Sequence, residues 1–113
     1  MNPDEIKTVI DSVQNVKHRT IIILLYSTGM RLGEIAHLRI CDIDSKNMRI
    51  KVVQGKGAKD RYTILSEQVL QELRAYYLIY KPREYLFNGY RQGKPMGMRN
   101  IQHLVQKAIA QVG

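Results

Sequence analysis

Arg31 stands in a setting where a cation could hold a phosphate. It follows a Thr-Gly pair and precedes an apolar stretch, so we expect it in the opening turn of a helix. Free backbone N–H groups and the positive end of the helix dipole favour an anion there. Glu34 follows three residues later, close enough to pair with Arg31 and to fix the orientation of its guanidinium. An ordinary solvated ion pair is the alternative interpretation.

Lys56 is the second candidate, because it lies between two glycines in the segment Q-G-K-G-A-K-D at residues 54–60. Glycines permit positive φ, so a turn built on them can present its lysine to a nucleic-acid groove or to a reacting phosphate. Lys59 and Arg61 add positive charge on the return strand, where we expect contacts with DNA backbone phosphates. The alternative is a solvated turn lysine without a function.

The elements before these residues are expected to be helices. Residues 2–5, N-P-D-E, form a capping box with proline at the first helical position. Residues 19–27 are apolar nearly all round, which fits either a buried strand or a buried helix. The Thr-Gly pair that follows resembles a helix stop, so we favour a helix. This helix is expected to be the hub of the domain.

From Cys41 to Leu65 the pattern changes to alternation, which is typical of strands. Ile50 and Val52 share one face, and Arg49 and Lys51 share the other. The second strand, residues 61–64, alternates in the same way. We therefore expect a β-hairpin with one basic face, and Arg49 and Lys51 are predicted to bind DNA.

Two further helices are predicted after the hairpin. Ser66 can cap the first, which should end before Pro82. The residues expected on its apolar side are Val69, Leu70, Leu73, Tyr77 and Tyr80. A loop rich in Gly, Arg and Tyr follows at residues 84–97. The last helix is amphipathic, and its apolar residues are Ile101, Leu104, Val105, Ala108, Ile109 and Val112.

Length and charge limit the function classes. The 113 residues suffice for one modest core, so the chain is one domain or part of one. A net charge of +8, from 18 Lys and Arg against 10 Asp and Glu, favours nucleic acid as the partner. Cys41 is the single cysteine, which excludes an intrachain disulfide and a cysteine-built metal site. Without an apolar leader or spanning segment, we expect a cytoplasmic protein with no membrane partner.

Taken together, these segments resemble the tyrosine recombinases, the phage integrase family. The resemblance covers most of the chain: Y-S-T-G-M-R-L-G-E-I at residues 26–35, then Leu38, Asp42 and Ile43, then G-K-G-A-K-D-R at residues 55–61 and Leu65. The family has a T-G-x-R-x-x-E segment, an L-x-x-x-D-I segment and a G-K-G-x-K-x-R turn in the same order and spacing. A leading P-D-E-I helix and a closing amphipathic helix also match.

The resemblance implies roles for three residues. Arg31 is similar to the first catalytic arginine, which binds the scissile phosphate and stabilises its transition state. Glu34 is similar to the acidic neighbour that steadies this arginine. Lys56 is similar to the hairpin lysine that protonates the departing 5′ oxygen. The family cleaves DNA through a 3′-phosphotyrosyl bond and rejoins it, with neither metal nor nucleotide cofactor.

The sequence departs from the family pattern toward its end. The second cluster of the family, H-x-x-R with a later nucleophilic Tyr, lies beyond a helix like the last one here. No His in these 113 residues is followed three residues later by Arg, and no tyrosine occupies the nucleophile's place. His18, His37 and His103 are expected at the surface or its boundary. We therefore expect residues 1–113 to be a truncated catalytic domain without the N-terminal core-binding domain and the C-terminal catalytic segment.

The predicted fold is α+β: mostly helical, with a small three-stranded antiparallel sheet that places Arg31, Lys56 and the basic strand face on one side. The parent would assemble as a tetramer on double-stranded DNA, whereas the isolated chain should bind DNA weakly and should not cleave it. Because the missing segment should cover the apolar faces of Leu104 and Ile109, we expect marginal stability or self-association. The rival hypotheses are a non-catalytic basic DNA-binding module and a protein-interaction domain with an acidic partner.

Overall fold

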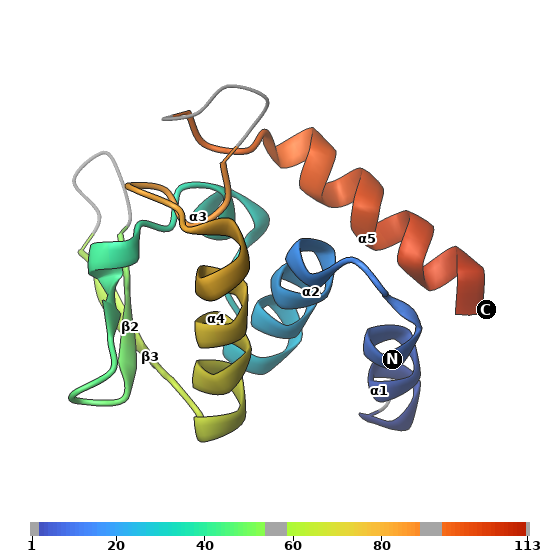
Figure 1. Cartoon of the computed structure of the whole chain (residues 1–113), viewed down its shortest axis with the longest axis horizontal. Helices are drawn as coiled ribbons and strands as arrows, with labels where there is room; N and C mark the ends of the chain where they lie inside the picture. The colour runs from blue at the N-terminus through green and yellow to red at the C-terminus, as the bar shows by residue number, and fades with distance from the viewer. Residues whose placement is uncertain (1–2, 54–58, 89–93, 113) are drawn as a thin grey trace.

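The computed structural model describes residues 3–53, 59–88 and 94–112 of the chain (Figure 1). In chain order the elements are α1 (Pro3–Ser12), α2 (Val16–Thr28), α3 (Leu32–Ala36), the 3-10 turn η1 (Ile40–Asp42), β1 (Ile43–Asp44), β2 (Arg49–Val52), β3 (Arg61–Ile64), α4 (Glu67–Tyr80) and α5 (Met98–Val112). The predicted α+β class, mostly helical with a three-stranded antiparallel sheet, is confirmed.

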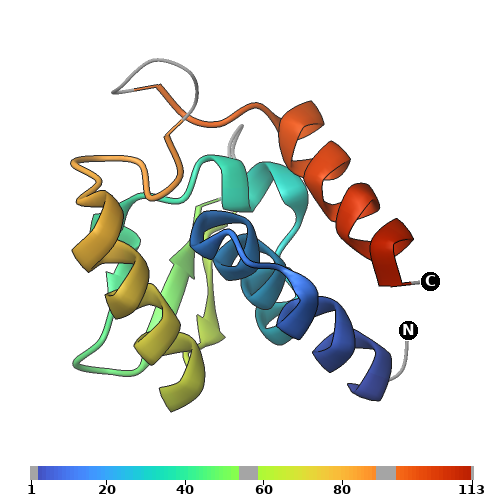
Figure 2. The same cartoon turned by 45° about the vertical axis from the view of Figure 1, so that its right-hand side comes forward.

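The apolar segment near residue 20 is a helix, α2, and it is the hub of the domain as predicted. Its N-terminus is capped by the Asn15 side chain, which accepts a hydrogen bond from the His18 backbone N–H. It ends at Gly29, whose φ of 69° lies in the left-handed region that glycine adopts without strain. Figures 1 and 2 show α2 between the sheet with α4 on one side and α1 with α5 on the other.

The sheet is antiparallel in the order β1-β2-β3. The β2–β3 register pairs Ile50 with Thr63 and Val52 with Arg61, and directly opposed residues share a face. Ile50 and Val52 are buried in the core, so this face of the sheet points toward the helices. The predicted hairpin is confirmed, and its inner face carries Arg61 and Thr63 on β3.

Helix α4 begins as predicted, because the Ser66 side chain accepts a hydrogen bond from the Val69 backbone N–H. It ends at Tyr80, with Lys81 as the C-terminal cap, before Pro82. The predicted apolar side is wrong at its C-terminal end, since Tyr76 is buried whereas Tyr77 and Tyr80 are more than two-fifths exposed. The buried stripe steps by three residues from Leu73 to Tyr76, and the period of 3.6 residues allows this as readily as a step of four.

Helix α5 packs within the chain. Its side chains Ile101, Leu104 and Ala108 are buried, and Ile109 is half-buried. The prediction of an uncovered face at Leu104 is therefore wrong, because α1, α2 and α3 all lie against α5. Large exposed apolar side chains include Leu78 and Ile79 on α4, Ile64 on β3 and Met98 at the start of α5.

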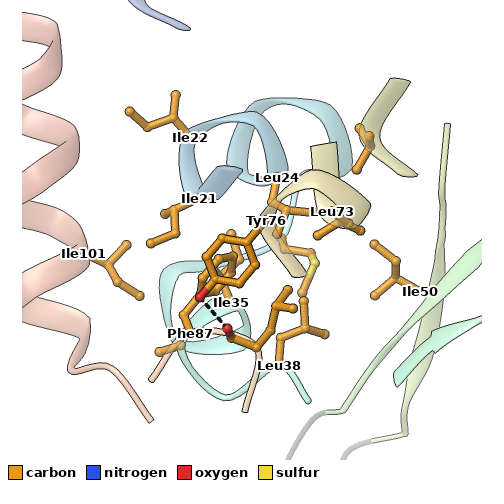
Figure 3. Packing of buried hydrophobic residues seen from close by; sticks show 14 of the residues in the cluster. Ile21, Ile22, Leu24, Ile35, Leu38, Ile50, Leu73, Tyr76, Phe87 and Ile101 are labelled. Carbon is orange, nitrogen blue, oxygen red and sulfur yellow. Dashed lines mark hydrogen bonds between the residues drawn. The ribbon is translucent and has the colours of Figure 1, made fainter. Parts of the chain in front are cut away.

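The core forms around the ring of Tyr76. Figure 3 shows Ile21 and Leu24 of α2, Leu38, Ile50 of β2 and Ile101 of α5 converging on one interior. The Tyr76 hydroxyl donates a 2.7 Å hydrogen bond to the Leu86 carbonyl oxygen, drawn as a dashed line. This contact joins α4 to the segment that follows it. No helix in the described part of the chain is long and apolar enough to cross a membrane.

Candidate functional site

The turn between α2 and α3 places Arg31 at the surface. Met30 is buried, and Arg31 has extended backbone angles, φ −79° and ψ 157°, as the residue that precedes the first turn of α3. Its side chain is exposed. The helix that follows has only five residues, so its dipole adds little to any anion site. The predicted position of Arg31 at a helix start is thus confirmed, and the phosphate-binding role expected for its guanidinium stays a prediction.

Glu34 holds the backbone of Arg31 and pairs with a different arginine. Its Oε1 accepts a 2.7 Å hydrogen bond from the Arg31 backbone N–H. The two Nη atoms of Arg61 donate to Oε2 and Oε1 of the same carboxylate, at 2.7 and 3.0 Å. Among residues 3–53, 59–88 and 94–112, the salt bridge of Glu34 is with Arg61. The ion pair expected between Glu34 and the Arg31 guanidinium is therefore replaced by this contact, because β3 brings Arg61 to the carboxylate.

Both members of the Glu34–Arg61 pair are favoured in their charged forms. The hydrogen bonds from Arg61 are the largest effect on Glu34 and lower its pKa, against the opposing effect of burial; the backbone N–H of Arg31 lowers the pKa further. The hydrogen bond to Glu34 likewise raises the pKa of Arg61. Glu34 is 11% exposed and Arg61 is 39% exposed, so the carboxylate is the more enclosed partner.

The three strand cations predicted to bind DNA, Arg49, Lys51 and Arg61, do not share one face of the sheet. Arg61 lies opposite Val52 on the inner face, whereas Arg49 and Lys51 lie on the outer face. The expectation that the hairpin cations lie on one side is wrong for Arg61. The register of the antiparallel pairing with β2 decides which face of the sheet each β3 side chain takes. On the outer face their cross-strand neighbours are Ile64 and Tyr62.

The outer face of the sheet is basic but partly neutralised. The Arg49 Nε lies 3.2 Å from Oδ2 of Asp44, and the Lys51 Nζ lies 3.7 Å from Oδ2 of Asp60. The Arg49 guanidinium also stacks on the Tyr62 ring, 4.0 Å from its centroid. This face therefore combines cations with an exposed aromatic ring, a composition suited to a nucleic-acid surface.

Lys56 lies outside the described residues, so the expected approach of Lys56 to Arg31 stays a prediction. Lys59 is exposed just beyond that segment. The strand that follows begins with Arg61, which contacts Glu34. His37 and His103 are exposed and His18 is intermediate in exposure, as predicted. Within the described ranges, no three His, Cys, Asp or Glu side chains gather as metal ligands would.

Sequence reasoning missed the inward position of Arg61. Apolar residues of a strand usually face the core, yet β3 turns Tyr62 and Ile64 outward, 52% and 81% exposed. The one available signal was the presence of Glu34 beside Arg31, an acid that needs a cationic partner when it is enclosed. The sequence pattern of β3 alone does not supply its direction.

Comparisons with known proteins identify the family that this chain resembles. Residues 1–113 match the profile of the phage integrase family. A candidate integrase/recombinase of Sinorhizobium fredii, y4qK, is 42% identical over 108 residues, which is 96% of this chain and 35% of that protein. The tyrosine recombinase XerC of Lactobacillus leichmannii is 33% identical over 97% of this chain and 41% of its own length.

A solved structure shares the fold over the whole chain. The crystal structure of XerA recombinase superposes with a TM-score of 0.89 at 28% sequence identity, covering 100% of this chain and 42% of that one. The chain thus spans about two-fifths of the length of these relatives. The profile match extends from the first residue to the last. The chain therefore belongs to the phage integrase family.

Proposed function

We propose that residues 1–113 are part of the catalytic domain of a site-specific DNA recombinase or integrase. The family match along the full chain supports this proposal, together with 42% and 33% identity to an integrase/recombinase and a XerC tyrosine recombinase. The parent protein would cleave DNA with a tyrosine, hold the strand through a 3′-phosphotyrosyl bond and rejoin it to another strand. Its active assembly would be a tetramer on double-stranded DNA.

The observation that carries the proposal is the setting of Arg31. Its side chain is exposed while its backbone N–H is held by Glu34, so the guanidinium projects from a fixed point. In the proposed site Arg31 binds the scissile phosphate and stabilises the charge that develops on it. Glu34 supports Arg31 through the backbone. An anchored backbone restricts where the guanidinium can lie, which lowers the entropic cost of holding the phosphate.

Lys56 is proposed as the general acid. The leaving 5′ oxygen would depart as a costly alkoxide unless a proton reached it, and a lysine ammonium can supply that proton. Lys59, Arg49 and Lys51 are proposed to contact backbone phosphates, which fix position without reading sequence. We propose no metal and no nucleotide cofactor, since the covalent link would conserve the phosphodiester energy.

Residues 1–113 hold the first half of the proposed chemistry. The H-x-x-R and nucleophilic Tyr of the family pattern are not among them. The chain by itself should therefore bind duplex DNA weakly, with little sequence preference, and form no covalent adduct. It would act together with the segments that supply the remaining groups.

Fluorescence anisotropy with a duplex of arbitrary sequence at low salt tests the binding part. We expect binding that weakens steeply with salt, and R31Q should lower the slope of log affinity against log salt by about one. K7Q is the matched control, because Lys7 is exposed on α1, far from the site in sequence. A chain that fails to bind DNA at low salt, or an adduct trapped on a suicide DNA substrate, would contradict the proposal.

A further inference from the structure

We propose that Arg61 is a positioning residue, which ties strand β3 to the start of α3 and thereby holds the backbone of Arg31, rather than a residue that contacts DNA. The inference rests on the proposed function in one respect, which is that Arg31 binds a DNA phosphate. It replaces the DNA-binding role expected for Arg61 with a structural connection between two elements.

One carboxylate makes the connection. Both oxygens of Glu34 receive Nη–H groups of Arg61, and Oε1 also receives the backbone N–H of Arg31. The bidentate geometry fixes the angle between the guanidinium and the carboxylate, which a single ammonium contact would not do. Arg61 therefore sets the position of Glu34, and Glu34 sets the position of the Arg31 backbone.

A second contact from the same strand holds the other end of the turn. The Thr63 Oγ1 donates a 3.1 Å hydrogen bond to the carbonyl oxygen of Thr28. Thr63 lies two residues after Arg61, so both side chains leave the same face of β3. Strand β3 thus holds the turn at Thr28, before Gly29, and at Arg31, after it. Two anchors three residues apart leave the turn little freedom to reorient.

The same contacts argue against a direct role for Arg61 on DNA. Both Nη atoms of Arg61 are committed to Glu34, and withdrawing them for a phosphate would leave a carboxylate that is 11% exposed without its cationic partner. Arg61 also begins the strand that follows residues 54–60, the segment that contains Lys56. The tie therefore connects the strand leaving that segment to the helix start that carries Arg31.

The connection from Arg61 through Glu34 to the Arg31 backbone can be measured by NMR on the intact 113-residue chain. The Arg31 backbone amide donates to Glu34, so its ¹H and ¹⁵N shifts report protonation of that carboxylate as pH falls. In R61Q the midpoint of this titration should rise, because the group that lowers the Glu34 pKa most has been removed. R61K should restore part of the shift. R19Q, which breaks the Arg19–Glu72 salt bridge between α2 and α4, should leave the midpoint unchanged.

DNA binding then separates positioning from direct contact. If Arg61 acts through Arg31, R61Q and R31Q should each weaken binding roughly three- to tenfold, and the double variant should bind no more weakly than R31Q alone. E34Q is the sharper case. It raises the net charge, so simple electrostatics predicts tighter binding, whereas loss of the anchor predicts weaker binding.

The outcomes are distinct. Additive effects of R31Q and R61Q would show that Arg61 contacts DNA, and tighter binding by E34Q would show that the added net charge outweighs any loss of the anchor. Either result would overturn the inference. If the unaltered chain does not bind DNA, the proposed function fails, and the Arg31 amide titration alone decides the tie. In that case an unchanged midpoint in R61Q overturns it, and a raised midpoint restored in part by R61K supports it. The R19Q chain serves as the control for folding in every measurement.

Discussion

Arg61 and Glu34, 27 residues apart in sequence, form a bidentate salt bridge with N···O distances of 2.7 and 3.0 Å. The contact joins the sheet to the short helix that begins beside Arg31. Its energetic value depends on the enclosure of Glu34, because exposed ion pairs contribute little in water. In our proposal this contact positions the Arg31 backbone, and its contribution can be probed by pH.

Stability should fall in acid through Glu34. Its pKa is lower in the folded chain than in the unfolded chain, so the unfolded state binds the proton first. The contribution of Glu34 is fully present above its unfolded value, about 4.3, and is lost as pH falls through the folded value. Thermal unfolding between pH 3 and pH 6 should show a gap between the unaltered chain and E34Q that closes toward low pH.

Other carboxylates complicate that measurement, and a second variant accounts for them. The pKa of Asp44 is also lowered, chiefly by the hydrogen bond from the Asn47 side chain. D44N therefore provides the matched control for a carboxylate on the outer face of the sheet. Parallel curves for the unaltered chain and E34Q across the whole range would contradict the role assigned to Glu34.

Removing the Tyr76 hydroxyl should destabilise the chain. Y76F leaves the Leu86 carbonyl without its donor inside the core, at a cost of about 1–3 kcal/mol in the free energy of unfolding. Y77F is the matched control, since Tyr77 is 48% exposed and a surface change of this kind should stay within about 0.5 kcal/mol. Urea unfolding followed by circular dichroism measures both. Equal effects would mean that the sides of α4 are assigned wrongly.

The packing of α5 predicts a similar contrast. L104A removes a buried side chain between α5 and its neighbours and should cost about 2–5 kcal/mol. L78A changes a side chain that is 72% exposed and should be nearly neutral, within about 0.5 kcal/mol. The difference tests whether α5 is covered within the chain. A neutral L104A would restore the expectation that another segment is needed to cover this helix.

The sequence predicted the elements better than it predicted their faces. Gly29 ends a helix and Ser66 begins one through local chemistry, and local chemistry is readable from neighbouring residues. Helical periodicity, by contrast, left Tyr76 and Tyr77 nearly equivalent. Tertiary contacts separate them, because the Tyr76 hydroxyl bonds the Leu86 carbonyl and the Tyr76 ring packs against Phe87.

The candidate site shows the same contrast between local signals and tertiary contacts. Arg31 could be found from its position after Thr-Gly, which is a local signal. The partner of Glu34 could not, because Arg61 reaches it through the register of β3 with β2 and the packing of the sheet on the helices. Arg31 was the expected partner of Glu34 because it lies three residues away in sequence. Strand pairing instead brings the Arg61 side chain to the carboxylate.

The outer face of the sheet supplies a test of DNA contact that is separate from Arg31. Arg49 and Lys51 are half-exposed and share this face with Tyr62. Asp44 and Asp60 already neutralise part of their charge, so each cation must exchange an acidic partner for a phosphate when DNA binds. The exchange weakens each contact with DNA, but each cation that reaches a phosphate still releases counterions from the DNA.

R49Q and K51Q should therefore each lower the slope of log affinity against log salt by about one, with only a modest loss of affinity. K7Q, on α1, should leave the slope unchanged. If R49Q and K51Q behave like K7Q, the outer face does not meet DNA, and DNA contacts must lie on the side of the molecule that carries Arg31.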